Sequence, residues 1–290
     1  MHRITRGIIG LIWLFASALH AEPLYWQATN GSLQITLLGA IHVGAPSMYP
    51  LPKPIYKALN QADGLIIEAD VRKDQNVVYP QNQPSSKQVL TKEQLFMLDK
   101  IAKQLELEPL GLRQAPPWQS ALSIQFRQLQ QLGFNPGEGV DLTLMYKATA
   151  NNIAVIPLET VQFQIDALTR QPDAGKEMLT EIIDDWEKSE AMTRCMIDSW
   201  VAGDQQNLEN MMKLNEYSNE LEQTLVTNRN RDWVNKLTSG QFLPNPNGRY
   251  LMVVGALHLV GHDNVLELLS QKGFTITRLN QAKKAGCQFY

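Results

Sequence analysis

Two histidines occupy matching positions in two segments that lie far apart in the chain. His42 ends the tetrad Gly39–His42 after an apolar run, and His258 ends the tetrad Gly255–His258 after another. A glycine lets the backbone turn sharply and leaves space beside the side chain that follows. Imidazoles held on rigid strands are common ligands of catalytic metal ions. The repeat therefore predicts two strand ends that present imidazoles to one cleft.

Two carboxylates follow a third apolar run, which begins at Gly64. Glu68 and Asp70 are at its end, and ligands of an open α/β sheet collect outside the carboxyl ends of its strands. We therefore expect Glu68 to join His42 and His258 as a metal ligand, with water completing an open set. Asp70 is expected to orient a histidine through its second ring nitrogen. A structural role is the alternative, since a single histidine or strand-end carboxylate usually hydrogen-bonds to backbone.

Other polar residues are candidates for the same rim. Glu159 follows a short apolar strand, as Glu68 does, and we expect it to contact the ligands or substrate. Asp141 falls in the first turn of a helix, where the dipole favours a carboxylate, so capping competes with function for Glu138 and Asp141. Arg229 could neutralise a carboxylate, hold a substrate carbonyl or form a salt bridge within the helical layer. His262 is expected at a helix start or behind the ligands rather than as a ligand.

The chain resembles the TraB/GumN family from residue 33 to residue 279, and its arrangement is similar to that of the related Tiki metalloproteases. The resemblance implies a divalent metal ion, Mn²⁺ or Co²⁺ with Zn²⁺ as an alternative, held by His42, Glu68 and His258. It also implies peptide-bond hydrolysis, and it adds Asn230 to the residues that surround the ligands or substrate. The matching segments are Gly39–His42, Ile67–Asp70, Gly139–Asp141, Leu158–Thr160 with Gln164, Arg229-Asn230 and Gly255–His258.

Length and charge restrict the fold and the partners. A chain of 290 residues with 44% hydrophobic residues can bury one large core that carries a helical insertion. The net charge of −3 and the pI near 6.0 provide no basic surface for nucleic acid. The expected partner is therefore a peptide or small-molecule substrate.

The N-terminus is typical of a secretory signal peptide. Basic residues at positions 3 and 6 precede an uncharged apolar stretch over 7–18, and Ala21 closes the segment. The stretch is shorter than the roughly 20 apolar residues that a transmembrane helix needs. We expect a signal peptide at 1–21, cut after Ala18 or Ala21, and a periplasmic or secreted domain at 22–290. A retained membrane anchor is the alternative, because Leu19 is unusual three positions before a cut at Ala21.

The sequence leaves open whether the two cysteines form a disulfide bond. Cys195 and Cys287 are the only two, and their spacing matches no zinc-ligand pattern. In an exported protein they could form a disulfide that closes a long loop. A free thiol or an intermolecular bond is the alternative.

The apolar periodicity predicts an α/β (α+β) fold in a single domain, with a mixed sheet formed by N- and C-terminal β-α-β units. A helical insertion covers about 90–237, and Thr91 with Gln94 forms a capping box at the start of its first helix. The first unit is expected to be parallel and right-handed, and a loop over 74–86 is expected to cross the site. The expected strands are 33–38, 64–68, 153–156, 250–254 and 274–279, and the expected helices include 52–60, 116–133, 139–150, 176–201, 204–214, 217–237 and 264–271.

These features predict an exported metal-dependent hydrolase, with a peptidase as the first choice. A bound ion lowers the pKa of its water from about 15.7 toward 7. Glu159 or Asp70 would then pass a proton to the leaving group, and Arg229 would stabilise the oxyanion. The chain has no His-Glu-x-x-His helix, which separates it from the common zinc peptidases. The alternatives are a non-catalytic binding protein for haem, a metal ion or a signalling peptide, and an esterase that acts on a non-peptide substrate.

Overall fold

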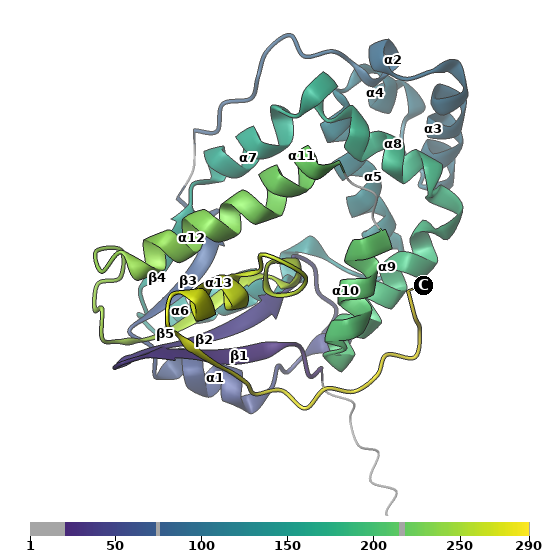
Figure 1. Ribbon diagram of the computed structural model, residues 1–290. Helices are drawn as coiled ribbons and strands as arrows, with labels where there is room; N and C mark the ends of the chain where they lie inside the picture. The colour runs from purple at the N-terminus through teal and green to yellow at the C-terminus, as the bar shows by residue number, and fades with distance from the viewer. Residues whose placement is uncertain (1–20, 74–75, 215–217, 290) are drawn as a thin grey trace, which may run out of the picture.

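A mixed six-stranded sheet forms the centre of the computed structural model, which describes residues 21–73, 76–214 and 218–289. The strand order is β4-β3-β5-β2-β1-β6 (Figure 1). The predicted fold class, a mixed sheet with a large helical middle region, is confirmed. The strands are β1 (Tyr25–Asn30), β2 (Leu33–Ala40), β3 (Gly64–Ala69), β4 (Val155–Glu159), β5 (Arg249–Gly255) and β6 (Thr275–Arg278).

Four neighbouring strands of this sheet run parallel. β2 pairs with β5, β5 with β3 and β3 with β4, all in the same direction. β1 is antiparallel to β2, and β6 is antiparallel to β1. β2 and β3 are parallel, as predicted, but β5 from the far end of the chain lies between them. The carboxyl ends of β4, β3, β5 and β2 therefore form one continuous rim.

Strand β1 is absent from the sequence prediction, whose first strand begins at Leu33. It forms a hairpin with β2 in which Asn30 is opposite Leu33 and Gly31 adopts a positive φ of 57°. The two-residue loop is Gly31-Ser32, and a glycine followed by serine between two strand-forming runs is a hairpin signal.

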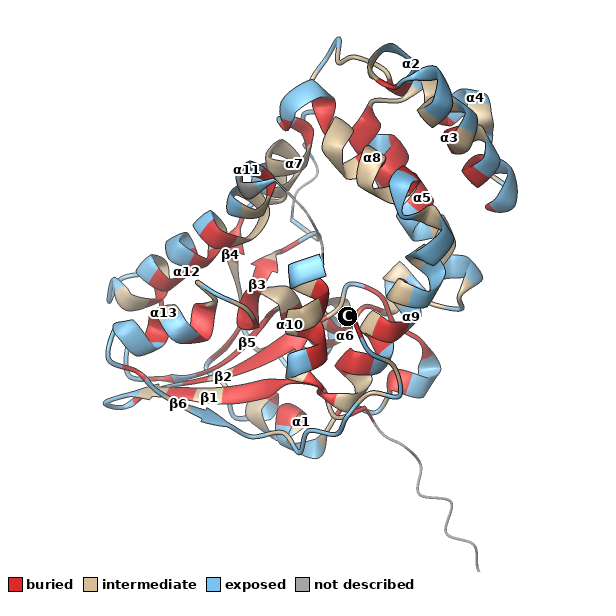
Figure 2. Ribbon diagram, turned by 45° about the vertical axis from the view of Figure 1, so that its right-hand side comes forward, coloured by how far each residue is buried: buried red, intermediate tan, exposed pale blue. Residues whose placement is uncertain are grey.

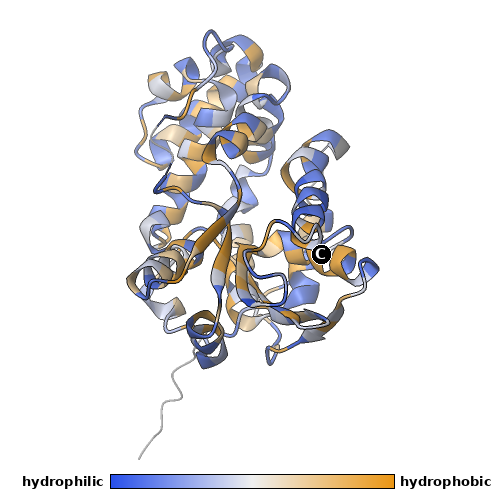
Figure 3. Cartoon of the chain, turned by 90° about the vertical axis from the view of Figure 1, so that its left-hand side faces the viewer, coloured by the Kyte–Doolittle hydropathy of each residue, from blue (hydrophilic) through white to orange (hydrophobic). Residues whose placement is uncertain are grey.

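Both faces of the parallel strands are buried, as expected for a sheet covered by helices. In β3, Leu65 and Ile67 pack on one face, whereas Ile66 packs on the other. Figure 3 shows the hydrophobic residues gathered in these central strands. Helices α1 (Lys53–Asn60) and α6 (Val140–Ala150) contribute to the first core, and α12 (Asn228–Thr238) and α13 (Val265–Gln271) contribute to the second.

A group of helices with its own hydrophobic core stands apart from the sheet (Figure 2). The predicted capping box between Thr91 and Gln94 is present at the start of one of them. The helix predicted over 176–201 is interrupted at Asp185 and forms two helices. The group contains α2 (Ser86–Val89), α3 (Lys92–Gln104), α4 (Pro109–Gln114), α5 (Pro117–Gln131) and α8 (Lys176–Asp184).

The remaining helices connect this group to the sheet. The helix predicted over 217–237 is a short α-helix, a π-helical turn and α12 in succession. The part of the predicted loop that is described, from residue 76 to Ser85, is irregular. The connecting helices are α7 (Val161–Thr169), α9 (Trp186–Ala202), α10 (Gln205–Leu214), α11 (Asn219–Glu222) and the π-helical turn η4 (Gln223–Thr227). Short 3₁₀ turns occur at η1 (Pro46–Met48), η2 (Pro136–Glu138), η3 (Pro172–Ala174) and η5 (Ala256–Leu259).

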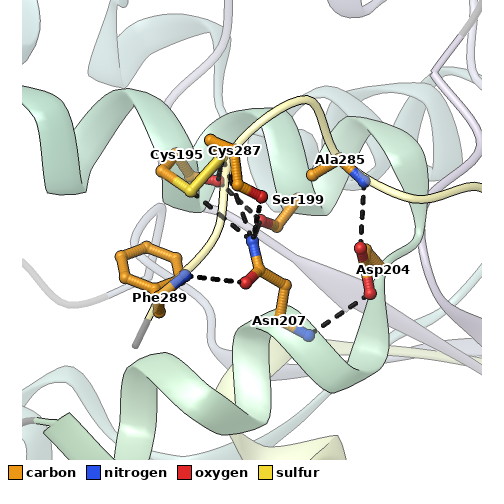
Figure 4. The surroundings of a disulfide bond; sticks show 7 residues. All are labelled: Cys195, Ser199, Asp204, Asn207, Ala285, Cys287 and Phe289. Carbon is orange, nitrogen blue, oxygen red and sulfur yellow. Dashed lines mark hydrogen bonds between the residues drawn. A yellow bond between two sulfur atoms is a disulfide. The ribbon is translucent and has the colours of Figure 1, made fainter.

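The C-terminal tail is fastened to α9 by a disulfide bond. Cys195 in α9 and Cys287 in the tail are joined with an S–S distance of 2.05 Å, which resolves the question that the sequence left open. The side-chain amide of Asn207 donates to the Cys287 carbonyl at 3.1 Å and accepts from the Phe289 amide at 2.9 Å (Figure 4). The tail is therefore held by a covalent bond and a buried amide together.

The predicted signal peptide falls outside the described residues, apart from Ala21. None of the helices in the described part of the chain combines the length and the apolar character that crossing a membrane requires.

Candidate functional site

Four functional side chains meet at the rim because four adjacent parallel strands deliver them. Glu159 is the last residue of β4, Glu68 lies near the end of β3, and His42 follows β2 by two residues. His258 lies in η5, the 3₁₀ turn that begins where β5 ends. Since β5 lies between β2 and β3, His258 is placed between the strands that carry His42 and Glu68. The predicted meeting of the two tetrads is observed.

Glu68 is at the centre of the cluster. Its Oε1 atom lies 3.9 Å from His42 Nε2 and 4.0 Å from His258 Nε2. The backbone N–H of Gly255 donates to the same oxygen at 2.7 Å. A Cβ atom at Gly255 would lie 3.3 Å from that oxygen and 3.4 Å from His258 Cδ2. The glycine of the second tetrad therefore leaves the space in which the three groups approach one another.

The other nitrogen of each imidazole is fixed by a polar side chain. His42 Nδ1 lies 3.0 Å from Asp141 Oδ2, and His258 Nδ1 lies 2.7 Å from Asn230 Oδ1. The Asn230 amide group donates to the Asp263 carbonyl, so its oxygen faces the ring and accepts a hydrogen bond from the Nδ1–H group. This leaves the lone pair of His258 on Nε2, toward Glu68. Metal-ligating histidines are commonly oriented in this way.

The two histidines differ in exposure. The His42 side chain is 59% exposed, whereas His258 and Glu68 are each 8% exposed. His42 is therefore the side from which solvent or a ligand reaches the cluster.

Arg229, in the first turn of α12, is held by partners on all three of its nitrogens. Nη2 donates to Glu68 Oε2 at 2.6 Å and to Glu159 Oε2 at 2.9 Å, and Nε donates to Glu159 Oε1 at 2.9 Å. Nη1 donates to the Leu225 carbonyl at 3.0 Å and lies 3.4 Å from His258 Nε2. Of the roles considered for Arg229, neutralising carboxylates is the one observed, because all five N–H donors are already directed at protein atoms.

Trp233 is the functional residue that the sequence reasoning missed. It is fully buried, and its Nε1 donates to Glu159 Oε1 at 2.8 Å. Its ring lies 4.4 Å from the His258 ring between centroids and 4.9 Å from Arg229 Cζ. Trp233 is one helical turn beyond Arg229, so i, i+4 spacing on α12 was the signal that could have identified it. Gln164 of α7 also reaches the cluster, 3.2 Å from Glu68 Oε2 and 3.5 Å from Glu159 Oε2.

Asp70 lies away from the histidines, one of which it is expected to orient, whereas His262 is not a ligand, as expected, and precedes the start of α13. Asp70 forms hydrogen bonds of 2.7 Å with Arg72 Nε and Nη2, so its carboxylate does not orient a histidine. The reason is that β3 ends at Ala69 and Asp70 belongs to the turn that follows. His262 is 74% exposed and pairs with Glu222 at 3.2 Å, away from the ligands.

The surroundings shift the pKa values of Glu68, His258 and His42 in different directions. Burial raises the pKa of Glu68, but the charges of the histidines and Arg229 and the Gly255 N–H outweigh it and lower the pKa to about 2. Burial lowers the pKa of His258 to about 4, so His258 is neutral at pH 7. At that pH the charge of Arg229, rather than a charge on His258, stabilises the ionised Glu68 carboxylate. Desolvation lowers the pKa of His42, yet the hydrogen bond to Asp141 and the charge of Glu68 prevail and raise it to about 9.

Within the described ranges, no group of three or more His, Cys, Asp and Glu side chains is arranged to hold a metal ion as the side chains stand. Arg229 occupies one Glu68 oxygen and approaches the free nitrogen of His258. The donor types of His42, Glu68 and His258 are nevertheless those that divalent transition metals accept. Their separations of 3.9 and 4.0 Å exceed the roughly 3.4 Å between two donors of a tetrahedral ion with bonds of about 2.1 Å, so binding would draw the three groups closer together.

The charge of the cluster also suits a divalent cation. An ion would require both imidazoles as neutral ligands, so His42 would first lose its proton. In that state Glu68, Glu159 and Asp141 bring three negative charges and Arg229 brings one positive charge, which leaves −2. A divalent ion would cancel this excess.

Comparisons with known proteins identify the family of the chain. The model of the TraB/PrgY/gumN family matches residues 24–278. The chain is 32% identical over 260 residues to YbaP of Escherichia coli (strain K12), described as an uncharacterized protein, with 87% of this chain and 96% of that protein covered. YbaP of Shigella flexneri gives the same identity and coverage. No solved structure matches the chain.

Proposed function

Because this chain belongs to the TraB/PrgY/gumN family, we propose that it is a metal-dependent hydrolase with its reaction centre at His42, Glu68 and His258. The observation that supports this most is that both imidazoles direct Nε2 at the same Glu68 oxygen, while Asp141 and Asn230 fix the opposite nitrogens. A peptide is the proposed substrate.

The three residues would hold Mn²⁺ or Co²⁺, with Zn²⁺ as an alternative. Such an ion supplies a water molecule of lowered pKa and polarises a bound carbonyl. Glu68 would offer Oε1, which keeps one lone pair after accepting the Gly255 N–H. Its other oxygen is held by Arg229. The pairing therefore fixes which Glu68 oxygen faces the imidazoles.

The residues of the cluster have separate roles in the proposed reaction. His42, the exposed ligand, marks the side on which the substrate enters. Glu159, expected from the sequence to move a proton, accepts hydrogen bonds from Arg229, Trp233 and Gln164 and is 2% exposed. Arg229, expected to stabilise the oxyanion, directs every N–H donor at protein atoms in the metal-free arrangement. We assign both as positioning residues that hold Glu68 and His258 in place.

The proposed location is the periplasm or the extracellular space. The Cys195–Cys287 disulfide supports this, because disulfides persist in oxidising compartments. It agrees with the signal peptide predicted from the sequence. Membrane attachment is proposed only if that segment is retained.

The test is a metal-dependent cleavage assay on residues 22–290. Metal-free protein receives Mn²⁺, Co²⁺ or Zn²⁺ and is incubated with a fluorogenic peptide library. Cleavage should require the ion and should be abolished by His42→Ala and by His258→Ala. His262→Ala is the matched control, since this histidine is exposed and paired with Glu222 outside the cluster, and it should leave the rate unchanged.

Other results of this assay would contradict the role of the metal ion or favour one of the alternative functions. Cleavage that persists in chelator would remove the metal from the proposal. Tight stoichiometric binding of haem, a metal ion or a peptide without product would favour the non-catalytic alternative. Turnover of esters but not of peptides would favour the esterase.

A further inference from the structure

Arg229 balances two buried carboxylates at once. The Glu68 and Glu159 side chains are 8% and 2% exposed, and the same nitrogen, Arg229 Nη2, donates to both. Two carboxylates buried this deeply would repel each other strongly without a cation between them. The guanidinium therefore supplies, inside the protein, the positive charge that the cluster needs.

Arg229 also faces the lone pair that a metal ion would use. His258 Nδ1 donates to Asn230, so Nε2 is the accepting nitrogen. Arg229 Nη1 lies 3.4 Å from it, a long contact compared with the 2.6 to 2.9 Å bonds that the other Arg229 nitrogens make. Nη1 keeps a second partner, the Leu225 carbonyl at 3.0 Å. The contact with His258 is thus the one that Arg229 can give up most easily.

We propose that Arg229 competes directly with the metal ion for His258 Nε2 and releases that nitrogen when the ion binds, while its contacts with Glu159 remain. This inference rests on the proposed function, because it concerns the same ligands. Glu159 accepts from Nε, and the Trp233 ring lies against Cζ of the guanidinium, so a small rotation within this support moves Nη1 away from His258.

A π-helical turn places Arg229 for this role. Such turns occur mostly as single wide turns and frequently lie at functional sites. Gln223–Thr227 is π-helical and ends immediately before α12, and the Leu225 carbonyl of this turn is the partner of Nη1. The wide turn therefore supplies the acceptor that keeps Nη1 satisfied after it leaves His258.

The test measures Mn²⁺ affinity by isothermal titration calorimetry, with no substrate present. The double variant Arg229→Met/Glu159→Gln removes the competitor and keeps the net charge of the cluster. It should bind Mn²⁺ roughly tenfold more tightly than the wild-type protein, as expected for the loss of one competing charge-assisted contact. Arg229→Lys keeps the charge but lacks the Nη1 group, and it should also bind more tightly. Arg231→Met is the matched control, because Arg231 is 54% exposed and pairs with Asp263.

The outcomes separate the two proposals. Weaker or unchanged affinity in both Arg229 variants, with circular dichroism reporting a native fold, would overturn the competition and leave the metal site standing. If neither the wild-type protein nor any variant binds Mn²⁺, Co²⁺ or Zn²⁺, the proposed function itself fails.

Discussion

His42 and His258 come from nearly identical tetrads, yet their surroundings give them different properties. His258 is enclosed beneath the Trp233 ring, and burial lowers its pKa to about 4. His42 is more than half exposed, and the carboxylates of Asp141 and Glu68 raise its pKa to about 9 against the effect of desolvation. At pH 7 the metal-free protein should therefore carry one charged and one neutral imidazole at the site.

We predict that long-range ¹H–¹⁵N NMR of histidine-labelled, metal-free protein will show this difference. His42 should titrate well above pH 6.5, and His258 should stay neutral to below pH 5. Because the folded pKa of His42 is raised, its contact with Asp141 stabilises the fold below pH 6.5, and that contribution is lost as the pH rises through about 9. Asp141→Asn should move the pKa of His42 back toward 6.5. Titration of His42 below pH 6.5 in the wild-type protein would contradict the assigned pair.

Asn230 offers a second prediction at the residue scale. Asn230→Ala removes the acceptor for His258 Nδ1, so the ring loses its fixed orientation. If the proposed ligands hold an ion, Mn²⁺ affinity should fall by about 10- to 100-fold in calorimetry. Asn228→Ala, two positions earlier on the exposed side of the helix, is the control and should bind as the wild type does. Equal affinity in both variants would mean that Asn230 does not support a ligand.

The sequence predicted that the three central residues converge for one physical reason, and it misplaced others for another. His42, Glu68 and His258 end parallel strands, and strand ends of a parallel sheet share a rim. Asp141 and Asn230 could be named only through the family resemblance or a weak capping argument. Asp70 was misplaced because alternation was extended past the last residue of β3. Trp233 was missed because a tryptophan inside a helix looks like any core residue.

Among the elements, the turn after β2 and the start of α6 form one unit that holds His42 against Asp141. Gly44 and Asn135 exchange backbone hydrogen bonds of 3.0 and 2.8 Å, and Val140 N–H donates to the Ile41 carbonyl at 3.2 Å. The close approach depends on the glycine, since a Cβ atom at Gly44 would lie 1.9 Å from the Glu138 carbonyl oxygen.

Gly44→Ala should therefore destabilise the fold by about 2 kcal/mol or more, since overpacking against backbone typically costs about 1–3 kcal/mol. Urea unfolding followed by circular dichroism would measure it. Gly286→Ala is matched in chemistry and has no atom within 4 Å of the added carbon, so it should unfold at the wild-type midpoint. A Gly44→Ala midpoint equal to that of the control would show that the two segments separate freely.

The turn after β3 predicts a dependence of stability on acid. Hydrogen bonds from Arg72 lower the pKa of Asp70, more than burial raises it. The stabilisation is therefore present above the unfolded pKa near 3.8 and is lost as the pH falls through the lower, folded value. Asp70→Asn should lower stability at pH 6 and flatten the loss below pH 4 in acid unfolding. Asp232→Asn, on a surface pair with Lys236, should retain the wild-type profile.

The predictable part of the fold is the part with local signals. Helix α3 has a capping box, and the apolar runs of β2, β3 and β5 are long enough to be recognised. The position of β5 between β2 and β3 could not be predicted, because pairing between segments more than 180 residues apart has no local signature. The break at Asp185 and the π-helical turn before α12 are set by packing.

On the scale of the whole molecule, the disulfide connects the last residues to the helical layer that supports the rim. Trp200, in the same helix as Cys195, donates from Nε1 to the Gly39 carbonyl at 2.7 Å, three residues before His42. The disulfide encloses a separation of 92 residues, for which loop closure in the unfolded chain is worth about 4 kcal/mol.

Cys195→Ser/Cys287→Ser should accordingly lower the free energy of unfolding by up to about 4 kcal/mol. Urea unfolding with and without dithiothreitol measures it. The reductant should destabilise the wild-type protein and leave the double variant unaffected. A reductant effect of equal size in both would mean that the two cysteines are not joined in solution.

The place of β5 in the sheet has a consequence for the biosynthesis of the protein. Until residues 249–255 have joined the sheet, β2 and β3 have no neighbour between them, and both keep apolar edges open to other chains. A chain that stops before β5 would be unable to close its sheet, so C-terminal truncations should accumulate as aggregates rather than as a smaller native form. An exported chain would therefore need protection from aggregation until its C-terminal segment has arrived.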